Sequence, residues 1–226
     1  MTRTLPLTST LGTMLRGVDQ RAVTPLVIPP GPSAVDVLWE PLGEALSGAT
    51  AVAPLPSPSE TMPATLVEAI RAAVDPESPV SADTAAVLTT SGSTGHPRGV
   101  VFRRDSLDAM TQQVNDLAGG EPAWVLTLPV TSIGGFNVVV RASATGRKPV
   151  AVASLAGASR FTDEKFSVAV HEAAQSGRPV AVSLVPAQLP RLLASAVGRR
   201  ALRSCSLILV GGAALDRKST RLNSSH

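Results

Sequence analysis

Residues Thr89–Val100 form the stretch TTSGSTGHPRGV, which decides the fold more than any other part of the chain. Three glycines, at positions 92, 95 and 99, stand among hydroxyl side chains, and Arg98 supplies one cation. The apolar residues AAVL precede the stretch and VVF follows it, so we expect a loop between two strands. Hydroxyls and open backbone N–H groups at a strand end form a nest for anionic oxygens, and glycine lets a backbone approach a ligand closely. The pattern predicts a phosphate-binding loop.

The commoner phosphate and nucleophile motifs are absent from this loop. A Walker A motif requires the spacing G-x-x-x-x-G-K, whereas Pro97 stands five residues after Gly92. Gly92 and Gly95 are three residues apart, which rules out the dinucleotide fingerprint G-x-G-x-x-G, and no G-x-S-x-G nucleophile elbow is present. A loop of glycine, serine and threonine alone is most often a linker, so the order of the residues carries the argument.

That order resembles the phosphate loop of the adenylate-forming superfamily, S/T-S/T-G-S/T-T-G-x-P-K-G-V/I. Nine positions match: Thr90, Ser91, Gly92, Ser93, Thr94, Gly95, Pro97, Gly99 and Val100. Arg98 stands where the family usually has lysine. Arginine keeps the charge but adds a planar fork, so the two side chains are not interchangeable. The resemblance implies that ATP phosphates are held by Thr90, Ser91, Gly92, Ser93, Thr94, Gly95 and Arg98.

Three further segments are similar to the same family, so that the resemblance covers residues 83–215. LPVTSIGGFNVVVRAS (128–143) resembles the block P-L/M-x-H-x-x-G followed by an apolar helix, with Ser132 in place of the histidine. VSLVPAQLPRLL (182–193) and LILVGGAAL (207–215) resemble stretches of the o-succinylbenzoate–CoA ligases of menaquinone biosynthesis. The last segment implies an adenine and acyl-adenylate contact through Gly211, Gly212 and Ala213, although a glycine pair that ends a strand is usually only a turn.

The resemblance also implies where the acyl group binds. Ser132 would lie in the wall of the acyl pocket and could donate a hydrogen bond, without the histidine's role. Arg141 follows the apolar run of the expected helix and either pairs with the second carboxylate of o-succinylbenzoate or is an ordinary surface cation. Ser183 and Gln188 either line the same pocket or serve strand and helix-end packing.

The implied activity is that of an ATP-dependent acid–CoA ligase. Such an enzyme makes an acyl-adenylate from ATP and an aromatic carboxylate, releases pyrophosphate, and passes the acyl group to the CoA thiol. ATP, Mg²⁺, CoA and a small carboxylic acid are therefore the expected ligands. The family's Y/F-G-x-T-E block, ribose-binding aspartate, hinge, adenylation lysine and the glutamate that helps hold Mg²⁺ are expected beyond residue 215. We therefore expect the chain to be a fragment that completes neither step and holds no identified catalytic residue.

Three alternatives stay open at this point. The parent protein could be another acyl-CoA or aryl-CoA ligase or adenylation domain, and a substrate screen would separate these. The chain could instead be a non-catalytic nucleotide-binding protein, or a fragment that does not fold because open strand edges aggregate. His96 and His171 are expected to be structural or exposed, and Cys205 a small buried residue. No cluster of His, Cys, Asp or Glu has the spacing of a metal site.

The last eleven residues, DRKSTRLNSSH (216–226), match the translation of a common sequencing-library adapter codon for codon. We therefore expect a non-native tail after Leu215, although Asp216 suits either origin. Arg217, Lys218, Arg221 and Asp216 give this tail a net charge of +2, so the formal charge of +3 falls to +1 without it. No basic stripe with interleaved aromatic residues remains, which argues against nucleic-acid binding.

Composition and periodicity predict an α/β fold in three segments. The hydrophobic fraction of 44% and charged fraction of 16% indicate a globular core, and neither a membrane-length apolar run nor a secretory signal is seen, which predicts a cytoplasmic protein. Residues 1–82 form a Pro-rich segment of the same domain, with helices expected at 35–46 and 64–74 and an irregular connection at Pro54, Pro56 and Pro58. The sequence leaves a homo-oligomer open.

From residue 83 to 215 strand and helix patterns alternate. Strands are expected at 85–90, 124–129, 148–155, 178–186 and 205–212, and helices at 105–119, 133–146, 162–177 and 186–202. Asp105 and Thr162 are the candidate N-caps. This alternation predicts a mostly parallel sheet flanked by helices, as in the partial N-terminal domain of an adenylate-forming enzyme, with the ligand beyond the carboxyl ends of the strands.

Overall fold

The structure is a computed structural model that describes residues 19–60, 62–90 and 97–212. The predicted phosphate-loop residues 91–96, Ala213 and the predicted tail, 216–226, therefore lie outside the described residues. In the part of the chain that is described, no helix combines the length and apolar character needed to cross a membrane.

The first sheet carries the strands on either side of the predicted loop. Its order is β2 (Val23–Ile28), β3 (Ala51–Pro56), β5 (Thr84–Thr90) and β6 (Arg98–Arg103), parallel except for β6, which runs antiparallel to β5. Thr90 pairs with Arg98, so the expected strand–loop–strand arrangement is confirmed. A separate pair joins β1 (Gln20–Arg21) to β4 (Val80–Ser81). Strands from both sides of residue 83 therefore share one sheet.

The expected irregular connection at Pro54 and Pro56 is wrong, because both residues lie in β3. Proline cannot donate to a strand ladder and is rare in central strands. The pairing of β3 with β5 is confined to Val52 and Ala86, whereas its pairing with β2 runs from Ala51 to Pro56. The part of β3 that carries the prolines is therefore paired on one side only.

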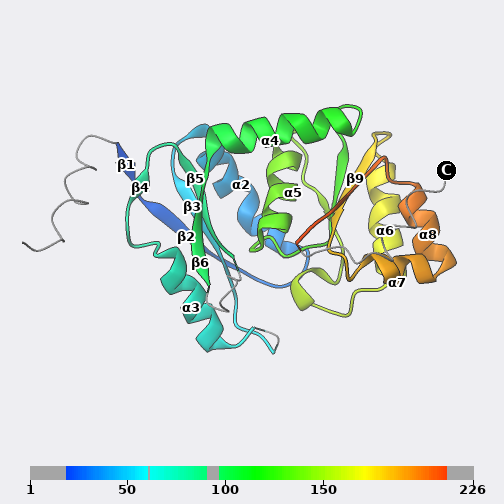
Figure 1. The fold of residues 1–226 in the computed structure, drawn as a ribbon, viewed down its shortest axis with the longest axis horizontal. Helices are drawn as coiled ribbons and strands as arrows, with labels where there is room; N and C mark the ends of the chain where they lie inside the picture. The colour runs from blue at the N-terminus through cyan, green and yellow to red at the C-terminus, as the bar shows by residue number, and fades with distance from the viewer. Residues whose placement is uncertain (1–18, 61, 91–96, 213–226) are drawn as a thin grey trace, which may run out of the picture.

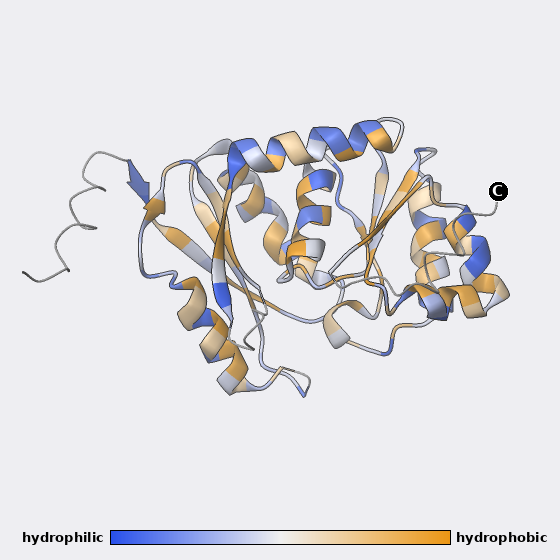
Figure 2. Ribbon diagram, in the orientation of Figure 1, coloured by the Kyte–Doolittle hydropathy of each residue, from blue (hydrophilic) through white to orange (hydrophobic). Residues whose placement is uncertain are grey.

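The second sheet is entirely parallel. Its order is β10 (Leu207–Val210), β9 (Val180–Leu184), β7 (Ala123–Leu126) and β8 (Val150–Ala151). Hydrophobic residues concentrate along these strands, as Figure 2 shows. The strand expected at 148–155 is shorter than predicted, because the chain turns after Ala151 and enters a 3₁₀ helix, η1 (Leu155–Gly157).

Helices separate and cover the two sheets (Figure 1). The inner layer contains α2 (Ser33–Ser47), which packs against the first sheet and against α5, and α5 (Ile133–Ser143), which packs against strands of both sheets. α3 (Ala64–Val74) covers the outer face of the first sheet, α6 (Asp163–Ala174) that of the second, and α8 (Ala196–Arg203) packs on α6. The other α-helices of the described residues are α4 (Arg104–Leu117) and α7 (Leu189–Ala194). The predicted α/β class is confirmed, as two sheets that share one hydrophobic core.

Polar side chains cap the N-termini of α5, α6 and α8, whereas the other described α-helices begin without a side-chain cap bond. Thr162 caps α6 as predicted, since its Oγ1 accepts a hydrogen bond from Lys165 N at 3.3 Å. Asp105 is not a cap: α4 begins one residue earlier, and the Asp105 carboxylate accepts from Ser106 N at 2.7 Å within the first turn. The single helix expected at 186–202 is broken at Ser195, which is extended and caps α8 through Gly198 N at 2.8 Å.

Cys205 provides a direct test of burial. It lies in the turn between α8 and β10, rather than in the strand, and burial raises the pKa of its thiol from 9.0 to about 12. The thiolate is the reactive form, so we expect the native thiol to react with Ellman's reagent about 100-fold more slowly than the unfolded thiol at pH 8. Absorbance traces with and without urea measure both rates. Equal rates would show that the thiol is accessible.

Candidate functional site

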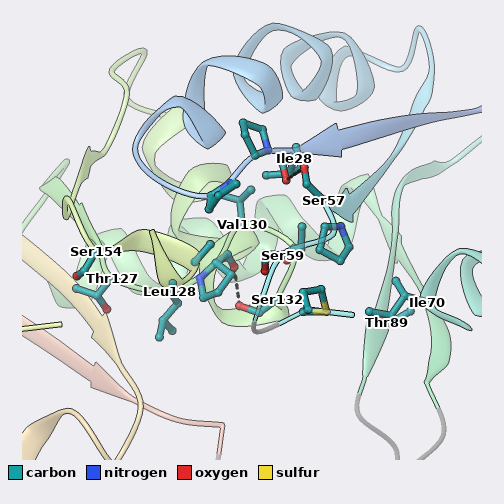
Figure 3. Close-up of a pocket in the computed structure, with 18 of the residues that line it drawn as sticks. Ile28, Ser57, Ser59, Ile70, Thr89, Thr127, Leu128, Val130, Ser132 and Ser154 are labelled. Atoms are coloured by element: carbon teal, nitrogen blue, oxygen red, sulfur yellow. Dashed lines mark hydrogen bonds between the residues drawn. The ribbon is translucent and has the colours of Figure 1, made fainter. Parts of the chain in front are cut away.

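A cavity of about 710 Å³ lies where parallel strands of both sheets end. Figure 3 shows its walls, with Ile28 and Ser57 from the first sheet facing Thr127 and Leu128 from the second. The lining comes from the chain at or just after each strand: 28–30 for β2, 56, 57 and 59 for β3, 89 and 90 for β5, 127–132 for β7, 154–161 in part for β8, and 185 and 188 for β9. The carboxyl ends of parallel strands are the usual ligand site in α/β sheets.

The walls are apolar with neutral polar groups placed among them. Met62, Leu66 and Ile70 extend the apolar wall from α3 and the chain before it. No charged side chain lines the cavity among residues 19–60, 62–90 and 97–212. Cavities of this size and polarity hold small organic ligands through apolar contact and a few directed hydrogen bonds. The described walls therefore suit an aromatic or apolar group with oxygen substituents.

Ser132 fixes the cavity wall to the start of α5. Its backbone is extended, its Oγ accepts from Gly135 N at 3.2 Å, and its hydroxyl donates to Pro129 O at 2.7 Å, the bond drawn in Figure 3. A Cβ on Gly135 would overlap the carbonyl oxygens of Leu128 and Pro129. Residues 128–132 are therefore packed tightly against the first turn of the helix, and the predicted residue Ser132 lines the cavity.

We expect Gly135→Ala to destabilise the protein by about 1–3 kcal/mol, because the backbone carbonyls that it meets cannot move away independently. The matched control is Gly134→Ala, whose new methyl meets only Cδ1 of Leu128, the end of a flexible side chain. Urea unfolding of the two variants measures the difference. Equal losses at the two positions would contradict close packing at Gly135.

Side chains join the ends of β7 and β9 at the cavity. The Thr127 hydroxyl donates to Ser183 O at 2.6 Å, Gln188 Oε1 accepts from Val185 N at 2.9 Å, and Gln188 Nε2 donates to Thr127 O at 3.4 Å. Thr127, Val185 and Gln188 line the cavity. Ser183 is 7% exposed and does not line the cavity; its backbone oxygen accepts the hydrogen bond from Thr127.

Arg141 is buried in the last turn of α5, within the helix expected at 133–146. Its guanidinium lies over the Trp124 ring, 5.4 Å from the centroid, and burial lowers its pKa. With 7% exposure it is not the surface cation that the sequence left open. It does not line the cavity, and its Nε has no hydrogen-bond partner. Its pairing with a substrate carboxylate stays a prediction.

The remaining predicted residues lie outside the cavity lining, except Thr90. Thr90 lines the cavity, and its strand partner Arg98 is exposed and does not line it. Gly211 N donates to Leu184 O at 3.1 Å, and Gly212 has a φ of 87°, with Val185 Cγ1 3.5 Å from the position of a Cβ. Neither glycine lines the cavity. The phosphate and adenine contacts therefore stay predictions.

The α3 side of the cavity was not predicted from the sequence. The helix expected at 64–74 is present, but Leu66 is 40% exposed and both Leu66 and Ile70 line the cavity. An apolar face that points into a cavity has the same periodicity as one that points into a core, so the pattern alone does not separate them. Among the described residues, no group of three His, Cys, Asp or Glu side chains is placed to hold a metal ion.

The family described as AMP-binding enzyme matches residues 36–223 of this chain. A probable 2-succinylbenzoate–CoA ligase of Mycobacterium tuberculosis is 35% identical over 135 residues, which are 60% of this chain and 34% of that protein. A 2-succinylbenzoate–CoA ligase of Enterococcus faecalis is 30% identical over 111 residues, 48% of this chain and 21% of that protein. The match thus spans about a third of the Mycobacterium protein's length.

Solved structures share the fold. A double mutant of o-succinylbenzoate CoA synthetase from Bacillus subtilis, bound to its product analogue, superposes with a TM-score of 0.60. That superposition covers 92% of this chain and 48% of the synthetase at 16% sequence identity. Similarity at this level of identity supports the predicted architecture, a mixed α/β arrangement of sheets flanked by helices.

Proposed function

The chain belongs to the AMP-binding enzyme family, and from this premise we propose that it is part of an acyl-CoA ligase that activates an aromatic carboxylate with ATP. The observation that carries the proposal is the cavity at the strand ends, between the base of the phosphate-type loop at Thr90 and the wall at Ser132. One end thus offers the hydroxyls of Thr89 and Thr90, with the exposed Arg98 paired to Thr90 in the next strand, and the other offers apolar walls toward an acyl group.

In the proposed reaction a carboxylate oxygen attacks the α-phosphorus of ATP, and the bond from that phosphorus to the pyrophosphate oxygen breaks. The thiolate of CoA then attacks the acyl carbonyl carbon and AMP leaves, while the thiol proton passes to solvent. Residues 90–95 and Arg98 hold the β- and γ-phosphates, and residues 211–213 pack along the adenine. Such a site works mainly by positioning and by charge stabilisation.

Mg²⁺ is proposed to enter with the ATP phosphates. In sites that bind nucleotides this ion is held by one or two carboxylates together with phosphate oxygens and waters. The described residues supply hydroxyls near the cavity at Thr89 and Thr90 but no acidic cluster. These hydroxyls are suited to hydrogen bonds with the phosphates. The proposed carboxylate ligand of Mg²⁺ comes from residues other than the described ones.

The proposed acyl substrate is o-succinylbenzoate, as in the named activity of the Mycobacterium and Enterococcus relatives. Ser132 and Gln188 line the proposed acyl pocket, and the backbone oxygen of Ser183 accepts a hydrogen bond from a third lining residue, Thr127. Arg141, which is buried, is the proposed partner of the second carboxylate. The proposal places residues 1–82 and 83–215 in one cytoplasmic domain. The second candidate is another aryl-CoA ligase, which the absence of a charged side chain from the described walls favours.

ATP–pyrophosphate exchange by the whole protein that contains this region tests the proposal. We expect exchange that depends on o-succinylbenzoate and is weak with monocarboxylic aryl acids. Exchange with aryl acids but not with o-succinylbenzoate would favour the second candidate, and no exchange with any acid would contradict ligase function. For the 226-residue chain itself, calorimetric titration with o-succinylbenzoate in the presence of ATP measures binding without requiring turnover.

A further inference from the structure

Gln188 holds a fixed position at the junction of the two strand ends in the cavity. Its backbone stands at the N-terminal end of α7, but its side chain turns back and makes no capping bond. Instead Oε1 accepts from Val185 N at 2.9 Å, just after β9, and Nε2 reaches Thr127 O at 3.4 Å, just after β7. The β7–β9 pairing ends at Leu126 and Ser183. Just beyond that point, the side-chain amide of Gln188 connects the ends of the two strands.

The bond from Val185 N decides which way the amide faces. A backbone N–H can only donate, so the group that receives it must be the Gln188 carbonyl oxygen. The NH₂ group therefore faces the other side, toward Thr127 and the cavity. Of its two hydrogens, one is directed to Thr127 O over a long 3.4 Å, and the other has no partner among the described residues.

Several hydroxyls in the same walls are already committed. Ser57 donates to Ile28 O at 2.8 Å, Thr127 to Ser183 O at 2.6 Å, and Ser132 to Pro129 O at 2.7 Å. Each of these hydroxyls donates its one hydrogen to a backbone carbonyl and therefore has none left for a ligand. Gln188 is different, because an amide has two hydrogens and its partly exposed side chain presents a spare one at the cavity surface.

We propose that Gln188 is a specificity-determining residue whose Nε2–H donates a hydrogen bond to an oxygen of the acyl group, away from the reacting carboxylate. This inference rests on the proposed function and adds to it one atom and one ligand class: aromatic acids that carry a ketone or carboxylate oxygen toward the β7–β9 end of the cavity. A site that hydrogen-bonds a substrate group discriminates strongly against analogues that lack it, because the protein group is then left unpaired.

Two ligands and two variants test the proposal by calorimetry on the 226-residue chain with ATP. The ligands are o-succinylbenzoate and 4-phenylbutanoate, which lacks the ketone and the second carboxylate. Gln188→Glu keeps the acceptor for Val185 N but cannot donate at neutral pH, and Gln188→Met removes both functions at similar size. We expect both variants to bind o-succinylbenzoate about ten-fold more weakly, or worse for Gln188→Glu, and to bind 4-phenylbutanoate within about two-fold of the parent chain.

Equal losses for both ligands would overturn the proposal, because they would show that Gln188 only holds the strand ends in place. Unchanged binding of o-succinylbenzoate in both variants would overturn it as well, and would leave the proposed function standing. If the parent chain binds 4-phenylbutanoate but not o-succinylbenzoate, the proposal and the named substrate fail together while aryl-CoA ligase chemistry survives. If neither acid binds to the parent chain, the inference about Gln188 is overturned, and ATP–pyrophosphate exchange by the whole protein decides the proposed function separately.

Discussion

Trp124→Ala is expected to lower the free energy of unfolding by about 3–5 kcal/mol, a large share of the stability of a domain of this size. Trp124 lies in β7, is 1% exposed, and belongs to the core cluster that joins the two sheets. Its removal leaves a cavity that the two flanking strands, β8 and β9, hold open because their ladders fix the backbone. The midpoint and slope of urea unfolding measure the loss.

The same substitution also removes the ring beneath Arg141. That guanidinium is buried, lies 5.4 Å from the ring centroid, and forms no ion pair within the described residues. A desolvated cation over an aromatic ring gains about 2 kcal/mol from the contact, so part of the cost of Trp124→Ala belongs to Arg141.

A double-mutant cycle separates the two contributions. Trp124→Ala in an Arg141→Met background should cost less than in the parent chain by about 1–2 kcal/mol, since methionine fills space without a buried charge. Trp124→Phe is the control that keeps a ring over the same strand and should lose less than Trp124→Ala. A loss below about 1 kcal/mol for Trp124→Ala would contradict the burial of this residue.

The helices and strands were predicted best where the signal comes from residues close together in the sequence. The strands around the loop at 91–96, the helix at 64–74 and the cap at Thr162 follow from periodicity and hydroxyl placement, and all are confirmed. Pro54 and Pro56 were misjudged because whether a proline fits a strand depends on which neighbour pairs at that point, and pairing is not encoded locally.

The site could be predicted in part for the same reason. Ser132 and Gln188 were predicted from the resemblance to the family's motifs, and both line the cavity beyond the carboxyl ends of the strands, where a parallel sheet usually binds its ligand. The α3 wall and the burial of Arg141 depend on how two sheets pack around α2 and α5, which the sequence pattern does not specify. The sequence left Arg141 open as a surface cation because its burial over Trp124 comes from packing between elements that are far apart in the chain.

Thr131→Trp is expected to weaken o-succinylbenzoate binding by at least about 100-fold, because an indole would take the space that an aromatic ligand needs. Thr131 lies between the end of β7 and the cap of α5, lines the cavity, and is half-buried. A larger side chain here extends into open space of about 710 Å³ rather than into packed core. We therefore expect overpacking to cost less than about 1 kcal/mol of stability, well under its usual range in a core.

Val168→Trp is the matched control, since it makes a similar increase in size on the outer side of α6, where Val168 is 67% exposed and lines no part of this cavity. Calorimetric titration of both variants with o-succinylbenzoate and ATP, together with urea unfolding, separates occlusion from misfolding. Full affinity in Thr131→Trp would place the ligand elsewhere in the molecule. Loss of affinity in Val168→Trp would mean that binding responds to remote changes, and the cavity would no longer account for it.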